Sequence, residues 1–306
     1  MSSNVSSQVS ANATADTAAR HRLGLLLVTV SAVAWSSAGF FTRLVPVDAW
    51  TTLVWRGLSG GLFGALFMLW WTGEGLGAFR RMGGPGWLVT GLSTLGMVTF
   101  IPALKLTSVA HVAIIYATVP FITGALAWLW LGERLSVRTL AAGLLAFTGV
   151  LITLRGAAWQ GGLAGDLLAF LMTVAMALAM VAIRRYREVS LVPATVLSNL
   201  LGVVISLPFA APLSVDARGI AYLVLFGLVQ MALGLTLFLI GSRLIPAAQA
   251  ALIGALETPL APLWVWLAFG ETPSDNALLG GAVVIAAVVG HVLLEERSRR
   301  LALQAG

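Results

Sequence analysis

The chain of 306 residues is too apolar for a water-soluble protein, because hydrophobic residues make up 59% of it and charged residues only 10%, whereas a soluble domain carries about 25% charged residues. Its net charge of +6 would suggest nucleic acid in a soluble protein, but the charges lie at the ends of apolar segments, so we expect a lipid bilayer as partner and no nucleic acid. The chain has no cysteine, which excludes disulfides, thiolate metal sites and cysteine nucleophiles.

Ten apolar segments follow a polar N-terminus. Residues 1–20 are small and polar and predict a disordered cytoplasmic tail. A bilayer core of about 30 Å needs roughly 20 apolar residues in a helix. The stretches that qualify are 23–44, 48–72, 86–106, 109–131, 137–155, 164–184, 192–212, 218–241, 246–269 and 275–294. The sequence therefore predicts an all-α membrane protein with ten transmembrane helices.

The basic residues divide unevenly between the two ends of these segments. With the N-terminus placed in the cytoplasm, thirteen lysines and arginines lie on the inside and four on the outside, and Arg56 alone falls well within a segment. Cytoplasmic loops of membrane proteins carry this excess of basic residues. Both termini are therefore predicted to be cytoplasmic, with a second tail at 295–306.

The second half of the chain resembles the first. Residues 108–136 and 246–274 each contain a mid-helix proline (Pro120 or Pro259), a Trp-rich run, a Gly-Glu pair and a final serine. This repeat divides the chain into halves at 21–155 and 156–294, each with five helices. Because five is odd, the halves must lie in opposite orientations, and inverted repeats are typical of secondary transporters that bind substrate between them.

These motifs carry a family resemblance over residues 23–294. The chain resembles the EamA type of the drug/metabolite transporter superfamily in three features: each proline followed eleven or twelve positions later by Gly-Glu, the runs WLWLGERLS and ETP, and an arginine in the second segment. Within that superfamily it is most similar to the YddG-type exporters of aromatic amino acids. The resemblance implies ten helices around a central cavity, in a bacterial inner membrane, and export by alternating access without ATP.

No enzyme motif contradicts this expectation. The chain contains no GxxxxGK[ST], HExxH or GxSxG sequence, so neither nucleotide binding nor hydrolysis is predicted. We expect no cofactor and no metal.

Two charges lie inside apolar segments, where each costs about 2.5–3.5 kcal/mol on insertion scales. Glu257 is either a packed or ion-paired structural group, or a cavity carboxylate that meets a cationic or zwitterionic substrate or a proton. Arg56 could pair with Glu257, bind a substrate carboxylate, or extend to the membrane interface. Pro120 and Pro259 are expected to break their helices and to allow gating.

Other side chains could complete a substrate site. Gln230 and Asn199 could form hydrogen bonds in the cavity or between helices. Tyr116, Trp35 and Ser36 offer aromatic surfaces and a hydroxyl group. Met176 belongs to a helical stripe with Met172 and Met180, which is either core or a soft wall for a flat ligand.

This set of residues predicts a transporter that exports small amphipathic solutes, with aromatic amino acids as the leading candidates. The ring would lie on Trp35, Tyr116 and the methionines. Glu257 would face the ammonium group, and Arg56 or Gln230 the carboxylate. The alternative is an exporter of other amino acids, metabolites or cationic drugs, with or without proton coupling. Glycines such as Gly280–Gly281 permit either a monomer or a homodimer.

Overall fold

The computed structural model describes residues 2–70, 73, 75–107, 109–155, 162–270 and 272–305. Within these residues every regular element is helical. The α-helices are α1 (Ser2–Ser36), α2 (Ala38–Leu44), α3 (Ala49–Trp70), α4 (Ala78–Arg81), α5 (Gly83–Leu106), α6 (Val109–Tyr116), α7 (Val119–Leu131), α8 (Val137–Thr153), α9 (Leu163–Arg185), α10 (Val192–Ser206), α11 (Ala217–Gly227), α12 (Leu235–Gly241), α13 (Ala247–Gly254), α14 (Glu257–Phe269) and α15 (Asp275–Ala305). A π-helix, η3 (Leu228–Gly234), joins α11 to α12, and two 3-10 turns, η1 (Leu207–Phe209) and η2 (Pro212–Ser214), follow α10.

By length and composition, eight helical stretches of the described residues could each cross a membrane. They match eight of the ten predicted segments. The other two predicted segments coincide with α5, which has 24 residues, and with α8, an apolar helix of 17 residues. The chain is thus a multi-pass membrane protein, while the number ten stays a prediction.

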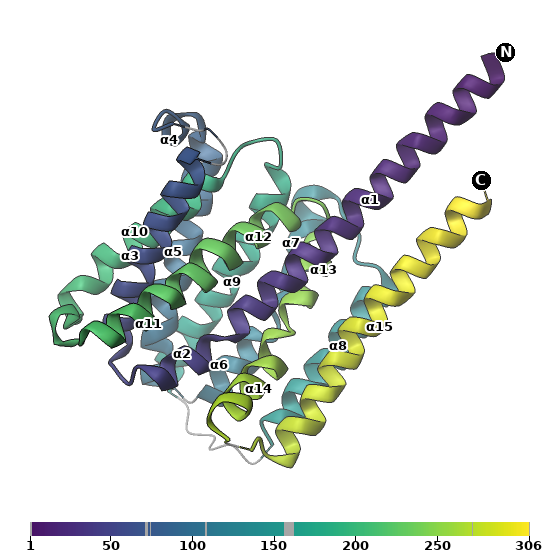
Figure 1. Cartoon of the computed structure of the whole chain (residues 1–306). Helices are drawn as coiled ribbons and strands as arrows, with labels where there is room; N and C mark the ends of the chain where they lie inside the picture. The colour runs from purple at the N-terminus through teal and green to yellow at the C-terminus, as the bar shows by residue number, and fades with distance from the viewer. Residues whose placement is uncertain are drawn as a thin grey trace.

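The structure differs from the predicted tails at both ends. Helix α1 begins at Ser2, where a disordered tail is predicted, and α15 continues to Ala305. Neither extension contains proline or glycine, the residues that most strongly oppose a helix, so nothing in the sequence interrupts it. Figure 1 shows both ends projecting from the same side of the bundle.

Glycines of α3 bring it close to α10, as its overlapping GxxxG spacings predict. A Cβ atom at Gly57 would lie 3.0 Å from the carbonyl oxygen of Asn199, and one at Gly61 would lie 2.8 Å from Leu200. Larger residues at either position would force the two helices apart. Small residues therefore set this contact.

Helices α8 and α15 pair in the same way along one edge of the bundle (Figure 1). A Cβ atom at Gly280 would lie 2.4 Å from the carbonyl oxygen of Gly149, and one at Gly281 would lie 3.0 Å from Pro259. Both glycines are therefore buried within the chain, and the suggestion that they offer a surface for a dimer is wrong.

Two membrane helices are interrupted at equivalent places in the two halves. Helix α6 ends at Tyr116 and α7 begins at Val119, whereas α13 ends at Gly254 and α14 begins at Glu257. Pro120 and Pro259 lie in the first turns of the second pieces, where a missing N–H removes no helical hydrogen bond. At each interruption the helical pattern gives way to tighter turns, in which Thr118 N–H donates to the carbonyl of Ile115 and Leu256 N–H donates to the carbonyl of Ile253.

Candidate functional site

Glu257 is the first residue of α14, so its carboxylate lies at a helix N-terminus inside the membrane segment. The helix dipole favours a negative charge at this position. The charge of Glu257 acts on two groups of the first half: the guanidinium of Arg56 on α3, and the phenol of Tyr116 at the end of α6. All three side chains are half-buried. The charge of Glu257 therefore acts on the guanidinium of the other half and on the end of α6, at the first helix interruption.

Arg56 is directed to the second half of the chain and not to the membrane interface. Its Nη1 donates a hydrogen bond of 3.2 Å to Oε1 of Gln230, and its guanidinium lies 5.4 Å from the ring centre of Phe226. Among the ion pairs of the described residues, none joins Arg56 directly to Glu257. The two opposite charges thus share a region without neutralising each other by contact.

Gln230 lies in η3 and is clamped to Trp35 of α1. Its Nε2 donates to the main-chain oxygen of Trp35, and Nε1 of Trp35 donates back to the main-chain oxygen of Gln230 at 3.1 Å. The Trp35 ring packs on Phe238 with ring centres 5.0 Å apart. At Gly234 a Cβ atom would lie 2.9 Å from Nε1 of Trp35, so this close approach requires glycine.

Two of the predicted site residues have their polar groups directed into helix contacts. Ser36 is fully buried; its hydroxyl accepts from Nε1 of Trp264 at 2.8 Å and donates to the carbonyl of Val33. Asn199 is buried between α10 and α3 and donates to the carbonyl of Thr195 in its own helix at 2.8 Å. The structure therefore places Ser36 in helix packing. The side-chain oxygen of Asn199 is buried and has no hydrogen-bond partner among the described residues, so a cavity role for Asn199 stays a prediction.

The methionine stripe divides between core and partly accessible positions. Met172 and Met180 are buried. Met176 is half-buried and touches α5 at Gly96, where a Cβ atom would lie 3.2 Å from its sulfur. Met176 is thus the member of the stripe that keeps accessible surface.

A polar cluster that the sequence did not predict joins α5, α6 and α9. Thr107 donates to Asp166 at 2.7 Å, and Nδ1 of His111 lies 3.0 Å from the same carboxylate oxygen. His111 lies near the start of α6. Its partner is 55 positions away, so no local pattern could show the pairing.

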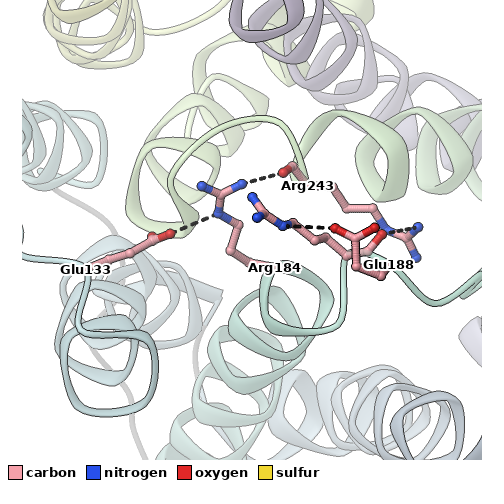
Figure 2. Close-up of polar contacts among 5 residues, drawn as sticks. Glu133, Arg184, Glu188 and Arg243 are labelled. Atoms are coloured by element: carbon pink, nitrogen blue, oxygen red, sulfur yellow. Dashed lines mark hydrogen bonds and ion pairs between the residues drawn. The ribbon is translucent and has the colours of Figure 1, made fainter. Parts of the chain in front are cut away.

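A second cluster joins three loops at the opposite end of α9 (Figure 2). Arg184 forms an ion pair of 2.9 Å with Glu133 of the Gly-Glu motif and also donates to the main-chain oxygen of Arg243. Arg243 in turn donates to the carbonyls of Arg187, at 3.2 Å, and Val189, at 2.6 Å. We call Glu133, Arg184 and Arg243 the arginine cluster. The sequence had marked Gly-Glu only as a repeat motif.

The fold and these features together define a class. A helical membrane protein with two halves, a broken helix in each, and charged side chains from both halves near the breaks is a membrane transporter of small solutes.

The chain belongs to the EamA-like transporter family, whose profile matches residues 22–155 and again 163–293. The two matches confirm the two-repeat architecture and the predicted superfamily. No curated protein matches the chain. A solved structure titled "Crystal structure of protein" superposes with a TM-score of 0.75 and 20% identity, covering 90% of this chain and 98% of the other. At that identity the likeness supports the fold alone.

Proposed function

We propose that the protein exports aromatic amino acids across the inner membrane of a bacterial cell, by alternating access between two inverted halves and without ATP. The observation that carries the proposal is the pair Glu257 and Arg56, two opposite charges from different halves that act on each other without forming an ion pair. An α-amino acid brings an ammonium group and a carboxylate that match this pair.

The same region holds aromatic residues that suit the side chain of an aromatic substrate. Tyr116 ends α6 within reach of the charge of Glu257. The half-buried Trp35 packs against Phe238 and forms a hydrogen bond with Gln230, the partner of Arg56. In the proposed complex the ring rests on Tyr116 and Trp35, the ammonium group faces Glu257, and the carboxylate faces Arg56. Met176 supplies a deformable apolar wall. The bound zwitterion offsets the cost of keeping two charges at membrane depth.

A second candidate is an exporter of cationic drugs or amines, with or without proton coupling. It is favoured by the hydrogen bond of Arg56 to Gln230 and its position over Phe226. These contacts satisfy the guanidinium without a substrate carboxylate. Glu257 would then be the main determinant of binding, and it could carry the coupled proton.

The test is uptake by the purified protein in liposomes, with labelled phenylalanine, tyrosine, tryptophan and leucine, and with phenethylamine, the amine that lacks the carboxylate of phenylalanine. We expect the three aromatic amino acids to be transported, and Glu257→Gln to remove most of the uptake. A matched control is Glu188→Gln, because Glu188 is also acidic but its side chain is 89% exposed. Absence of aromatic amino acid uptake would refute the proposal, and uptake of phenethylamine alone would establish the second candidate.

A further inference from the structure

Both polar atoms of the Gln230 side chain form hydrogen bonds within the protein, although the sequence suggested a role in substrate binding. Its residue is 3% exposed. Its amide oxygen accepts from Arg56, its amide nitrogen donates to Trp35, and its main-chain oxygen accepts from the Trp35 indole. A substrate could reach this amide only by displacing one of these contacts.

We propose that Gln230 is a positioning residue that makes the transporter selective for substrates with a carboxylate. Resting on the proposed function, the inference is that Gln230 orients Arg56 towards the carboxylate and does not itself touch substrate. Trp35 fixes the amide on one side, and Gly234 allows the close approach of Trp35. An unclamped arginine has many rotamers, and ordering such a side chain on binding costs free energy and so weakens the binding. Gln230 removes part of that cost before substrate arrives.

Selectivity is the property to measure, as the ratio of kcat/KM for phenylalanine to that for phenethylamine. Gln230→Met keeps the length of the side chain and deletes both amide contacts. We expect this ratio to fall several-fold, by less than the tenfold that about 1.4 kcal/mol produces. Gln230→Glu keeps an acceptor for Arg56 but adds a charge that competes with the substrate carboxylate, so it should also lower the ratio. A purely structural role would reduce both substrates equally and overturn the inference.

Arg56→Gln separates this inference from the function on which it rests. If Arg56→Gln leaves the ratio unchanged, Arg56 does not bind the carboxylate and that part of the proposed function fails. If Arg56→Gln abolishes the preference while Gln230→Met retains it, the proposed function stands and the positioning role is wrong.

A different observation concerns the end of the bundle that carries the arginine cluster. There the broken helix of the second half is packed tightly, because seven of the eight residues of α13 are buried. Its continuation α14 has one buried residue, Pro259, among thirteen. Ala127, Val181 and Ala247 also form a buried cluster next to Glu133 and Arg184. The part of this broken segment nearer the arginine cluster is therefore the more tightly packed of the two.

We infer that the arginine cluster is the latch that holds this end closed during the proposed transport cycle. Its contacts tie the α7–α8 connection of the first half to the α9–α10 and α12–α13 connections of the second. Most of these hydrogen bonds are accepted by main-chain oxygens, so they form only when the connections hold one backbone conformation. Opening towards this end must separate Glu133 from Arg184.

The natural chain lacks cysteine, so single cysteines can report accessibility to a thiol reagent in membranes. Ala250→Cys lies on α13 and is fully buried, whereas Thr258→Cys lies beside Glu257 and is half-buried. In the Glu133→Gln background we expect labelling at position 250 to rise several-fold and labelling at position 258 to fall. The control background is Glu188→Gln, which removes the neighbouring exposed ion pair with Arg187.

The direction of the two changes decides the outcome. If labelling rises at both positions, the substitution has only loosened the structure locally, and the latch is overturned. Unchanged labelling at both positions overturns it as well. Glu133→Asp, a shorter acid, is the milder variant if Glu133→Gln does not fold, and the same opposite changes are expected. Because labelling needs no substrate, this result does not depend on whether aromatic amino acids are the cargo.

Discussion

Replacing Gly227, the last residue of α11, by alanine should push α11 and the following η3 away from α3 and weaken the hold of Gln230 on Arg56. A Cβ atom at Gly227 would lie 1.9 Å from Oγ of Ser59 and 2.5 Å from the main-chain oxygen of Arg56. The serine hydroxyl can rotate away, but the carbonyl belongs to helix α3 and cannot. Since a carbon normally approaches a carbonyl oxygen to about 3.3–3.6 Å, the two helices must separate by roughly 1 Å.

Such overpacking typically costs about 1–3 kcal/mol, while alanine returns up to about 1 kcal/mol of helix propensity. We therefore expect Gly227→Ala to lower the free energy of unfolding by roughly 1–2 kcal/mol, together with a higher KM for phenylalanine. Thermal unfolding in detergent, followed by tryptophan fluorescence, measures the first effect, and liposome uptake the second.

The control is Gly91→Ala in α5, where a Cβ atom meets nothing within 4 Å. Its melting temperature and KM should match or exceed those of the natural protein. If Gly227→Ala behaves like Gly91→Ala in both assays, the reasoning from helix contact to the position of Arg56 is refuted.

Three further predictions use the same assays. Glu257→Asp, with an acid one methylene shorter at the start of α14, should keep some phenylalanine uptake that Glu257→Gln loses; equal loss in both would contradict a purely electrostatic role. Asp48→Ala should lower stability by about 1 kcal/mol, because Asp48 accepts from the backbone N–H of Thr51 at 2.9 Å at the start of α3. Burial raises the pKa of Asp48, but hydrogen bonds from Thr51 outweigh it and hold that pKa below its ordinary value. This stabilisation should therefore persist at neutral pH and be lost on acidification below about pH 4, with no such loss in Asp48→Ala. Gly280→Ala should destabilise the α8–α15 pair, whereas Gly290→Ala in the same helix meets nothing within 4 Å and should not.

The sequence predicted the features that depend on a short local pattern of residues. Pro120 and Pro259 marked both helix interruptions, and the glycines of α3 marked it as a helix that packs closely against another. The isolated charge of Glu257 could be recognised because placing a charged side chain in an apolar segment costs free energy. These signals need only a neighbourhood of a few residues to be recognised.

The partners of these residues could not be predicted. Gln230 and Trp35 are 195 positions apart, and Arg56 and Gln230 are 174 apart, so only the folded bundle reveals the clamp. For Ser36 and Asn199, the residue type alone could not decide between a cavity and a helix contact. Composition also misled at the N-terminus, where small polar residues predicted disorder but contain nothing that stops a helix.

The π-helix η3 has a consequence for how this protein could acquire a new specificity. A π-turn holds one residue more than an α-helical turn in the same stretch, and each α-helical residue turns the chain by about 100°. Deleting Gln230 or one of the two residues before it in η3 would let an ordinary helix form there and leave α12 in its present register. The residue that faces Trp35 and Arg56 would then change identity in one step. In this family member, a shift in substrate preference could thus arise from a change in chain length that leaves every other side chain as it was.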